Sequence, residues 1–370
     1  MRNRGNGNGE GGRAAVRWRQ VPLALAGDSP PAPASLSILD ERLRGTRFVA
    51  LANRTILNAP EQTGMDFWSL NPYVGCEFGC TYCYARYAHR YVVERAHAQG
   101  RLTDDELADF RGPHGWEAFE QRIFVKEQAV AALERDLRRH ARSTRPPAGP
   151  APIVIGTATD PYQPAERQFR LTRATLERLA RCEGLSVGLI TKSPLVARDV
   201  DILTRLQRHN AVEVYVSLIS VNAELVRSVE ARSPHPAARL RALARLAAAG
   251  VNAGLIVAPV LPRLTDDMPG LRALFDAARQ AGARFVCAGP LRLYPAVRDR
   301  FLPVLEECFP ALVTRYRAAY ARAASAPPVY ARALQRRIRR LQAEYGFSMN
   351  SGMVDRYKTA IPGTQGELRL

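Results

Sequence analysis

The sequence lacks the long apolar segments that anchor proteins in membranes. No uninterrupted apolar run reaches the roughly 18 residues of a membrane-spanning helix. The opening stretch, MRNRGNGNGEGGRAAVRWRQVPLALAGD, has basic residues but no sustained apolar core of signal-peptide length. We therefore expect a cytoplasmic protein with no membrane partner.

Cysteine is scarce too, and its distribution is uneven. Only six cysteines occur in 370 residues, which excludes the dense disulfide framework of a small secreted fold. Cys76, Cys80 and Cys83 are clustered in the run NPYVGCEFGCTYCYARYAHR, and the other three are isolated. Clustered thiols in a reducing compartment favour a metal centre over disulfide bonds.

Acidic residues are outnumbered by basic ones. The chain has 53 Lys and Arg against 35 Asp and Glu, for a formal net charge of +18. Such a surplus attracts phosphate polyanions, so a nucleic acid is a candidate partner. Much of the charge lies in Arg- and Ala-rich helical patterns at 237–249 and 331–343, where solvated helix faces explain it equally well.

Composition divides the chain into four parts. Residues 1–35 are rich in Gly, Asn, Arg and Pro and predict a disordered basic arm, because they cannot bury enough apolar area to offset chain entropy. Residues 36–66 form an N-terminal extension, and residues 67–300 form the core, with an insertion at about 88–150. Residues 301–370 form a helical C-terminal extension.

Within the core, short β-branched apolar runs alternate with amphipathic stretches, which is the pattern of repeated βα units. The runs are almost entirely apolar, as strands buried on both faces require. The first ends at Leu70, and the others are 152–157, 186–191, 212–218, 251–257 and 284–288. Six such units predict an α/β fold. The helical spacing of Leu334, Ile338 and Leu341 predicts a C-terminal helix packed on it.

The cysteine spacing C-x3-C-x2-C points to a particular metal centre. Three soft thiolates on one short loop can hold three corners of a [4Fe-4S] cluster, and the fourth iron then stays open to a small molecule. The alternative is a structural zinc site in which His89 joins Cys76, Cys80 and Cys83 as the fourth ligand. On that alternative the chain is a nucleic-acid-binding protein rather than an enzyme.

These residues carry a family resemblance. The triplet, with Tyr82 before its last cysteine and a strand before the loop, resembles the radical S-adenosylmethionine (radical SAM) superfamily. The stretches GTATDPYQPAE (156–166), ITKSPLVARDVDIL (190–203) and residues 249–262 resemble its spore photoproduct lyase-like branch, the DNA repair photolyase-like proteins. The resemblance covers about residues 48–300 and includes neither terminus.

The resemblance implies a partial (β/α)6 TIM-like barrel with helical N- and C-terminal extensions and the cysteine loop at the carboxyl ends of the strands. The implied cofactors are a [4Fe-4S] cluster and S-adenosyl-L-methionine (SAM). The implied reaction is lyase-like: reductive cleavage of SAM gives a 5′-deoxyadenosyl radical, which abstracts hydrogen from an unidentified substrate. A nucleic-acid base is one candidate. A reducing partner such as flavodoxin or ferredoxin would supply the electron.

The resemblance also implies which side chains meet SAM. Tyr82 is expected near the adenine, and the backbone near Ile256 and Val257 is expected to line it. Lys192, just after the third strand, is expected to pair with the methionyl carboxylate, and Ser217 with the ribose or the carboxylate. The alternative for Lys192 is an exposed loop lysine.

The end of the second strand departs from the superfamily pattern. Thr157, Thr159 and Asp160 are expected near the methionyl amino group, where typical members have a Gly-Gly-Glu-like stretch. Spore photoproduct lyases use a cysteine here as hydrogen donor, and this chain has no thiol at the position. Cys287 or Tyr162 are the candidate substitutes, and thymine-dimer repair is therefore not predicted.

Two further arginines, Arg232 and Arg239, flank the run SPHP in the connection to the next helix. We interpret them as surface residues, with a phosphate contact as the alternative.

Overall fold

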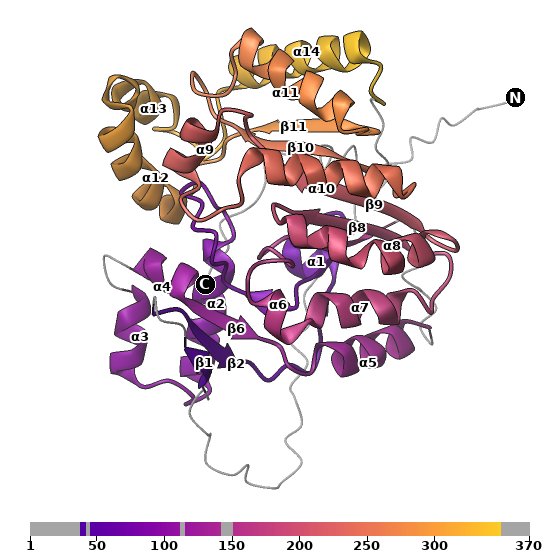
Figure 1. Cartoon of the computed structure of the whole chain (residues 1–370). Helices are drawn as coiled ribbons and strands as arrows, with labels where there is room; N and C mark the ends of the chain where they lie inside the picture. Colours follow the sequence, from indigo (N-terminus) through magenta and orange to yellow (C-terminus); the bar gives the residue numbers. More distant parts are fainter. Residues whose placement is uncertain (1–37, 42–44, 112–114, 142–150, 349–370) are drawn as a thin grey trace, which may run out of the picture. The chain divides into compact units, whose positions relative to one another are not determined.

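Six parallel strands form the larger of two sheets in this computed structural model, which describes residues 38–41, 45–111, 115–141 and 151–348 (Figure 1). In chain order they are β4 (Trp68–Leu70), β7 (Ile153–Ile155), β8 (Ser186–Thr191), β9 (Ala211–Ser217), β10 (Ala253–Val260) and β11 (Val286–Pro290). Neighbours in the chain are neighbours in the sheet, and a short strand, β3 (Leu57–Asn58), pairs antiparallel with β4 at one edge. The predicted partial (β/α)6 barrel is confirmed.

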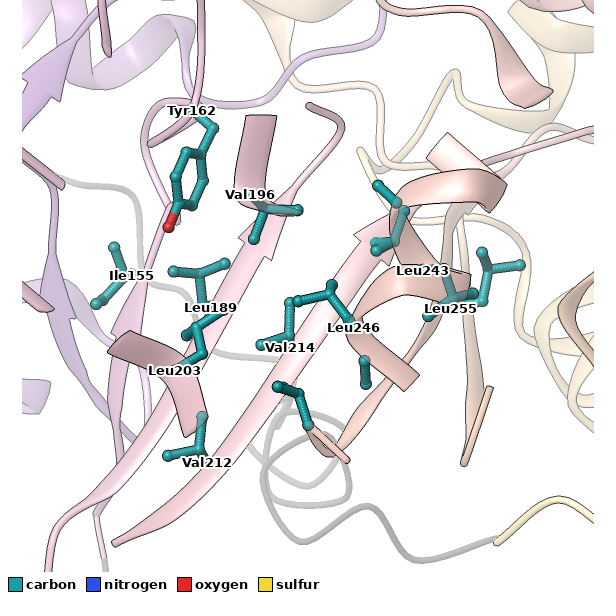
Figure 2. Close-up of a cluster of buried hydrophobic side chains, with 14 of the residues drawn as sticks. Ile155, Tyr162, Leu189, Val196, Leu203, Val212, Val214, Leu243, Leu246 and Leu255 are labelled. Atoms are coloured by element: carbon teal, nitrogen blue, oxygen red, sulfur yellow. The ribbon is translucent and has the colours of Figure 1, made fainter. Parts of the chain in front are cut away.

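Helices cover the outer face of this sheet. They are α5 (Ala129–Ala141), α7 (Leu171–Leu179), α8 (Val200–Gln207), α10 (Pro236–Ala248) and α11 (Met268–Gln280). Alternate strand residues such as Leu189, Val214 and Leu255 point toward these helices and pack in one core with Leu203, Leu243 and Leu246 (Figure 2). Because α5 packs against α7, it belongs to the helical layer of the barrel although it lies within the predicted insertion.

The opposite, interior face of the sheet has its own small cluster. Tyr215, Phe285 and Cys287 are buried there, and Ile190 and Ile256 pack against them. Ser217 of β9, Ile256 of β10 and Cys287 of β11 are register partners on adjacent strands. The interior face therefore has an apolar layer at these residues, with Ser217 toward the carboxyl ends of the strands and Glu213 on the same face of β9 toward its start.

The N-terminal extension differs from the prediction. It was expected to be helical, but its described part forms strands, and its one helix, α1 (Pro60–Thr63), is a single turn. The strands β1 (Ile38–Glu41), β2 (Arg47–Ala50), β6 (Arg122–Val125) and β5 (Tyr73–Val74) form a second sheet in this order. The runs RFVA and RIFV pair in parallel, and their apolar residues are too few to produce a clear periodicity in the sequence.

Three helices lie beside this small sheet (Figure 1). They are α2 (Arg86–Ala98), α3 (Asp104–Arg111) and α4 (Gly115–Gln121), all in the region of the predicted insertion. Val49, Val74, Val93 and Phe124 share a core cluster that joins the sheet to α2. Since β5 ends immediately before the first cysteine of the triplet, the small sheet fixes one end of the cysteine loop.

The C-terminal extension is helical over its described part, which ends at residue 348. It comprises α12 (Pro295–Cys308), a 3₁₀ turn at Pro310–Leu312, α13 (Val313–Ala319) and α14 (Pro328–Tyr345). Leu334, Ile338 and Leu341 of α14 are buried in the main core, which confirms the expected packing. Gln342 Nε2 also donates to the carbonyl oxygen of Val286 at 2.7 Å, so this helix supplies hydrogen bonding to the edge strand β11.

No helix within the described ranges has the length and apolar character needed to cross a membrane. The predicted basic arm, residues 1–35, lies outside the described residues.

Candidate active site

The cysteine loop runs from β5 to α2 and is held by backbone hydrogen bonds from distant segments. The amide of Cys76 donates to the carbonyl oxygen of Phe119 at 2.9 Å, and the amide of Thr81 donates to that of Val229 at 3.0 Å. Gly79 has a φ of +64°, and a β-carbon there would lie 2.8 Å from Glu120 Oε2. The left-handed backbone and the close neighbour both favour glycine at this position of the loop.

The three thiols of the loop have the donor chemistry of an iron–sulfur site. Cys76 and Cys80 are buried and Cys83 is partly buried, and none forms a disulfide. Burial raises the pKa of all three thiols, to about 12 for Cys80, and the negative charges of Cys80 and Cys83 raise that of Cys76 further. Binding of a metal group would displace their protons.

Cys76, Cys80 and Cys83 supply three thiolate donors for an iron–sulfur cluster. In a [4Fe-4S] cluster each cysteine binds a different iron, and thiolates are the preferred ligands. The donor set is therefore suited to the cluster that the sequence predicts.

His89, the proposed fourth zinc ligand, is committed elsewhere. Its Nε2 atom lies 2.9 Å from the carbonyl oxygen of Arg122, and its ring packs against Phe110, Phe119 and Phe124. Burial lowers the pKa of His89 to about 4. The imidazole is therefore a neutral core residue of α2, and the zinc alternative is not favoured.

Tyr82, Lys192 and Ser217, the residues expected to meet SAM, lie together in the structure. Lys192 Nζ donates to Ser217 Oγ at 3.2 Å and lies 5.6 Å from the centre of the Tyr82 ring. The Lys192 side chain is only 15% exposed, so the interpretation as an exposed loop lysine is wrong. Burial opposes its charged form, but the negative charges of Cys80 and Glu230 outweigh burial and raise the pKa of Lys192.

A buried ion pair that the sequence did not reveal supports these three residues. Glu230, at the end of α9 (Ala223–Val229), and Arg239 of α10 are both 0% exposed and form an ion pair. Tyr82 donates its hydroxyl hydrogen to Glu230 Oε1, and Arg239 Nη1 donates to the carbonyl oxygen of Ser217 at 2.9 Å. We call these five residues, Tyr82, Lys192, Ser217, Glu230 and Arg239, the Glu230 group.

The expectation that Arg239 lies on the surface is wrong. The run RLRALARLAAAG contains several arginines at helical spacing, and nothing in it distinguishes the buried one. The partner that makes burial tolerable, Glu230, comes before the helix and has no local signature.

Thr157, Thr159 and Asp160 lie after β7 and hold the edge of the site together. Thr157 Oγ1 lies 2.6 Å from Ser69 Oγ, and Thr159 Oγ1 donates to the carbonyl oxygen of Gly75 at 2.5 Å. Asp160 accepts from Thr191 Oγ1 and from the Lys192 amide, each at 2.7 Å. Their side-chain oxygens thus bind protein atoms and position Lys192 and the start of the cysteine loop.

The two residues of β10 face opposite ways. Ile256 packs on the interior face, in register with Ser217, whereas the side chain of Val257 is buried in the core shared with the helices. Of the candidate hydrogen donors, Cys287 is on the interior face and is 4% exposed. Tyr162 points into the helix-facing core, where its hydroxyl donates to Asp199 Oδ2 at 3.0 Å, so it does not reach the interior (Figure 2).

A six-stranded partial barrel with three thiols and a buried lysine at the carboxyl ends of its strands defines an enzyme class that holds an iron–sulfur cluster at the barrel mouth. The family model of the radical SAM superfamily matches residues 70–272, and the chain belongs to this superfamily. Its enzymes use a [4Fe-4S] cluster and SAM and need a reductant and a substrate.

Related sequences and structures agree with this assignment. Rv2578c of Mycobacterium tuberculosis (strain ATCC 25618 / H37Rv) is 32% identical over 343 residues, which cover 89% of this chain and 93% of that protein. MJ0683 of Methanocaldococcus jannaschii is 26% identical over 53% of this chain and 61% of its own length. A spore photoproduct lyase complexed with dinucleoside spore photoproduct superposes with a TM-score of 0.53 at 14% identity, covering 80% of this chain and 79% of that one. That likeness shows a shared fold.

Proposed function

We propose that the chain cleaves SAM reductively and uses the resulting 5′-deoxyadenosyl radical to abstract hydrogen from a nucleic-acid base. The observation that carries the first part is the convergence of Lys192, Ser217 and Tyr82 beside the three thiols of the cysteine loop. The cluster supplies the electron for cleavage when it is bound.

The residues of the chain bind and orient SAM. Lys192 offers a cationic donor to a carboxylate, and Asp160 fixes its backbone through the amide hydrogen bond. The Tyr82 ring is locked through its hydroxyl and presents an aromatic face. The apolar residues Tyr215, Ile256 and Phe285 beneath Ser217 exclude water from the interior face, which protects a reactive radical.

Three observations support a nucleic-acid substrate. The net charge of +18 favours a polyanion, and a protein of the same fold has been solved with a dinucleoside lesion bound. The third is a surface: Tyr87 and Tyr91, 45% and 59% exposed, lie one turn apart on α2, with the exposed Arg90 between them. Exposed aromatic rings with a neighbouring arginine are typical of surfaces on which bases stack.

Anaerobic reconstitution with iron and sulfide tests the chemistry. The protein should take up close to four irons, absorb broadly in the visible range and release 5′-deoxyadenosine from SAM on reduction. Cys80→Ala should abolish both properties without unfolding the barrel, whereas Cys308→Ala, a change at an exposed cysteine of α12, should affect neither. Stoichiometric zinc and no SAM cleavage in the parent protein would refute the proposal.

Isotope transfer tests the substrate. Oligonucleotides deuterated at candidate base positions should give deuterated 5′-deoxyadenosine, and a Tyr87→Ala, Tyr91→Ala double variant should weaken oligonucleotide binding about tenfold or more, at 1–3 kcal/mol per stacked base. Undiminished SAM cleavage with no oligonucleotide binding by the parent protein would remove the nucleic-acid part and leave the SAM chemistry in place.

A further inference from the structure

Three arginines surround one carboxylate on the backbone side of the cysteine loop. Arg86 Nη2 of α2 lies 2.6 Å from Glu120 Oε1 of α4, and Arg300 Nε of α12 lies 3.7 Å from the same oxygen. Arg232, between α9 and α10, forms an ion pair with Glu120 Oε2. We call these four residues the Glu120 cluster.

The Glu120 cluster lies directly against the cysteine loop. Arg86 Nη2 donates to the carbonyl oxygen of Cys80 at 3.0 Å, and Arg232 Nε donates to that of Glu77 at 2.7 Å. The absent side chain of Gly79 leaves the space that Glu120 and Arg232 fill. Two guanidinium groups of the Glu120 cluster thus donate hydrogen bonds to the segment that contains the thiols.

Cations outnumber the carboxylate in the Glu120 cluster. Among the contacts of the described residues, three guanidinium groups approach the Glu120 carboxylate, and the side chains of Arg86 and Arg300 are 3% and 16% exposed. Burial lowers the pKa of Arg300 and the neighbouring Arg86 and Arg232 lower it as well, although Glu120 raises it. Like charges held together away from water are unfavourable unless an anionic group lies nearby.

A thiolate-bound iron–sulfur cluster is such a group. Three cysteine thiolates bring three negative charges to the loop, and reduction by one electron from an external one-electron donor adds another. The potential of such a cluster depends on its net charge, on hydrogen bonds near its sulfurs and on exposure to solvent. A nearby cationic group stabilises the reduced form more than the oxidised form, because the reduced form is more negative.

We propose that the Glu120 cluster compensates the negative charge of the thiolate-bound cluster and raises its reduction potential. This inference rests on the proposed function, since it requires the [4Fe-4S] cluster at Cys76, Cys80 and Cys83. Arg232 is the residue to vary, because it is 41% exposed and a change there disturbs packing least.

The midpoint potential of the reconstituted protein, measured by a mediated redox titration followed by electron paramagnetic resonance, tests the proposal. Arg232→Gln removes the charge and keeps an amide that can donate to the loop. It should make reduction roughly threefold less favourable, which is about 28 mV for one electron. Arg232→Lys keeps the charge and should keep the potential near that of the parent. Arg208→Gln, at the end of α8, is the control and should have no effect.

A variant that removes a negative charge distinguishes an electrostatic effect on the potential from a structural effect on the loop. Glu120→Gln removes the negative charge and should raise the potential, whereas a merely structural role predicts the same loss of cluster from every variant. Equal shifts for Arg232→Gln and Arg232→Lys, or no shift for Arg232→Gln, would overturn the inference. A parent protein that binds no cluster would instead overturn the proposed function on which it rests.

Discussion

Two groups of charged residues lie beside the cysteine loop, and both contain a buried carboxylate paired with arginine. They differ in how many cations surround the carboxylate. In the Glu230 group, the carboxylate is fully engaged by Tyr82, Ser233 and Arg239, and Lys192 Nζ stays 4.0 Å from it. In the Glu120 cluster, three guanidinium groups share a single carboxylate. On the two proposals above, the first arrangement leaves the Lys192 ammonium for SAM, and the second places cations beside the iron–sulfur cluster.

Burial also separates one arginine of each group, Arg239 from Arg232. Arg239 and Glu230 are both completely inaccessible to solvent, whereas Arg232 is 41% exposed. A fully buried charge depends on its partner, because water cannot replace it. The same deletion should therefore have unequal effects in the two groups.

Removing one guanidinium from each group should give the largest difference in the free energy of unfolding. Arg239→Met leaves Glu230 buried and partly uncompensated and should reduce the free energy of unfolding by about 3–5 kcal/mol. Arg232→Met should cost about 1 kcal/mol or less, since Arg232 is partly solvated and Arg86 still pairs with Glu120. Urea unfolding followed by circular dichroism measures both, and equal losses would show that burial does not distinguish the groups.

Acid should lower the free energy of unfolding through His89 of α2. His89 has a pKa of about 4 in the folded chain and about 6.5 when unfolded, so between these values the unfolded chain binds the extra proton. Its stability contribution is complete above pH 6.5 and is lost as the pH falls toward 4, by about 3 kcal/mol in all.

Unfolding measured from pH 7 to pH 4 checks this slope. His89→Phe should flatten it, although it removes the hydrogen bond to Arg122. Tyr91→Phe, a change at an exposed α2 residue, should keep the parent slope. An unchanged slope in His89→Phe would show that other groups cause the acid sensitivity.

The smallest expected effect is on ligand affinity in the Glu230 group. Lys192→Met removes the ammonium that is proposed to bind the SAM carboxylate, a charged hydrogen bond of about 1.5–3 kcal/mol, or roughly 10- to 150-fold in Kd. Equilibrium binding of SAM to the reconstituted protein gives this ratio. Lys126→Met serves as the matched control, because Lys126 Nζ donates to the carbonyl oxygen of Asn71 rather than to Ser217. If both variants bind SAM as the parent does, Lys192 has no such role.

Much of the fold could be predicted because local patterns report it. The six strands have almost entirely apolar runs, and the predicted run 186–191 matches β8 at both ends. The spacing of Leu334, Ile338 and Leu341 predicted the buried face of α14 correctly. The small sheet was missed because β5 has two residues and β2 and β6 have four each, too few for a period to be visible.

The candidate site also has a part that local sequence patterns predict and a part that they do not. The thiols lie within eight residues of one another, so their spacing alone predicts a shared centre. Glu230 lies 148 residues from Tyr82, and Glu120 lies 112 residues from Arg232. No local pattern connects such pairs, and an arginine in an amphipathic helix looks the same whether it is exposed or buried.

The sequence by itself determined that this chain has a three-thiol loop after the first of six parallel strands, because these features depend on neighbours in the chain. Only the tertiary structure decided which charges surround that loop. Lys192, Glu230 and Arg239 meet on one side of it, and Arg86, Glu120 and Arg232 on the other. Burial makes those contacts strong, and burial is a property of the folded chain.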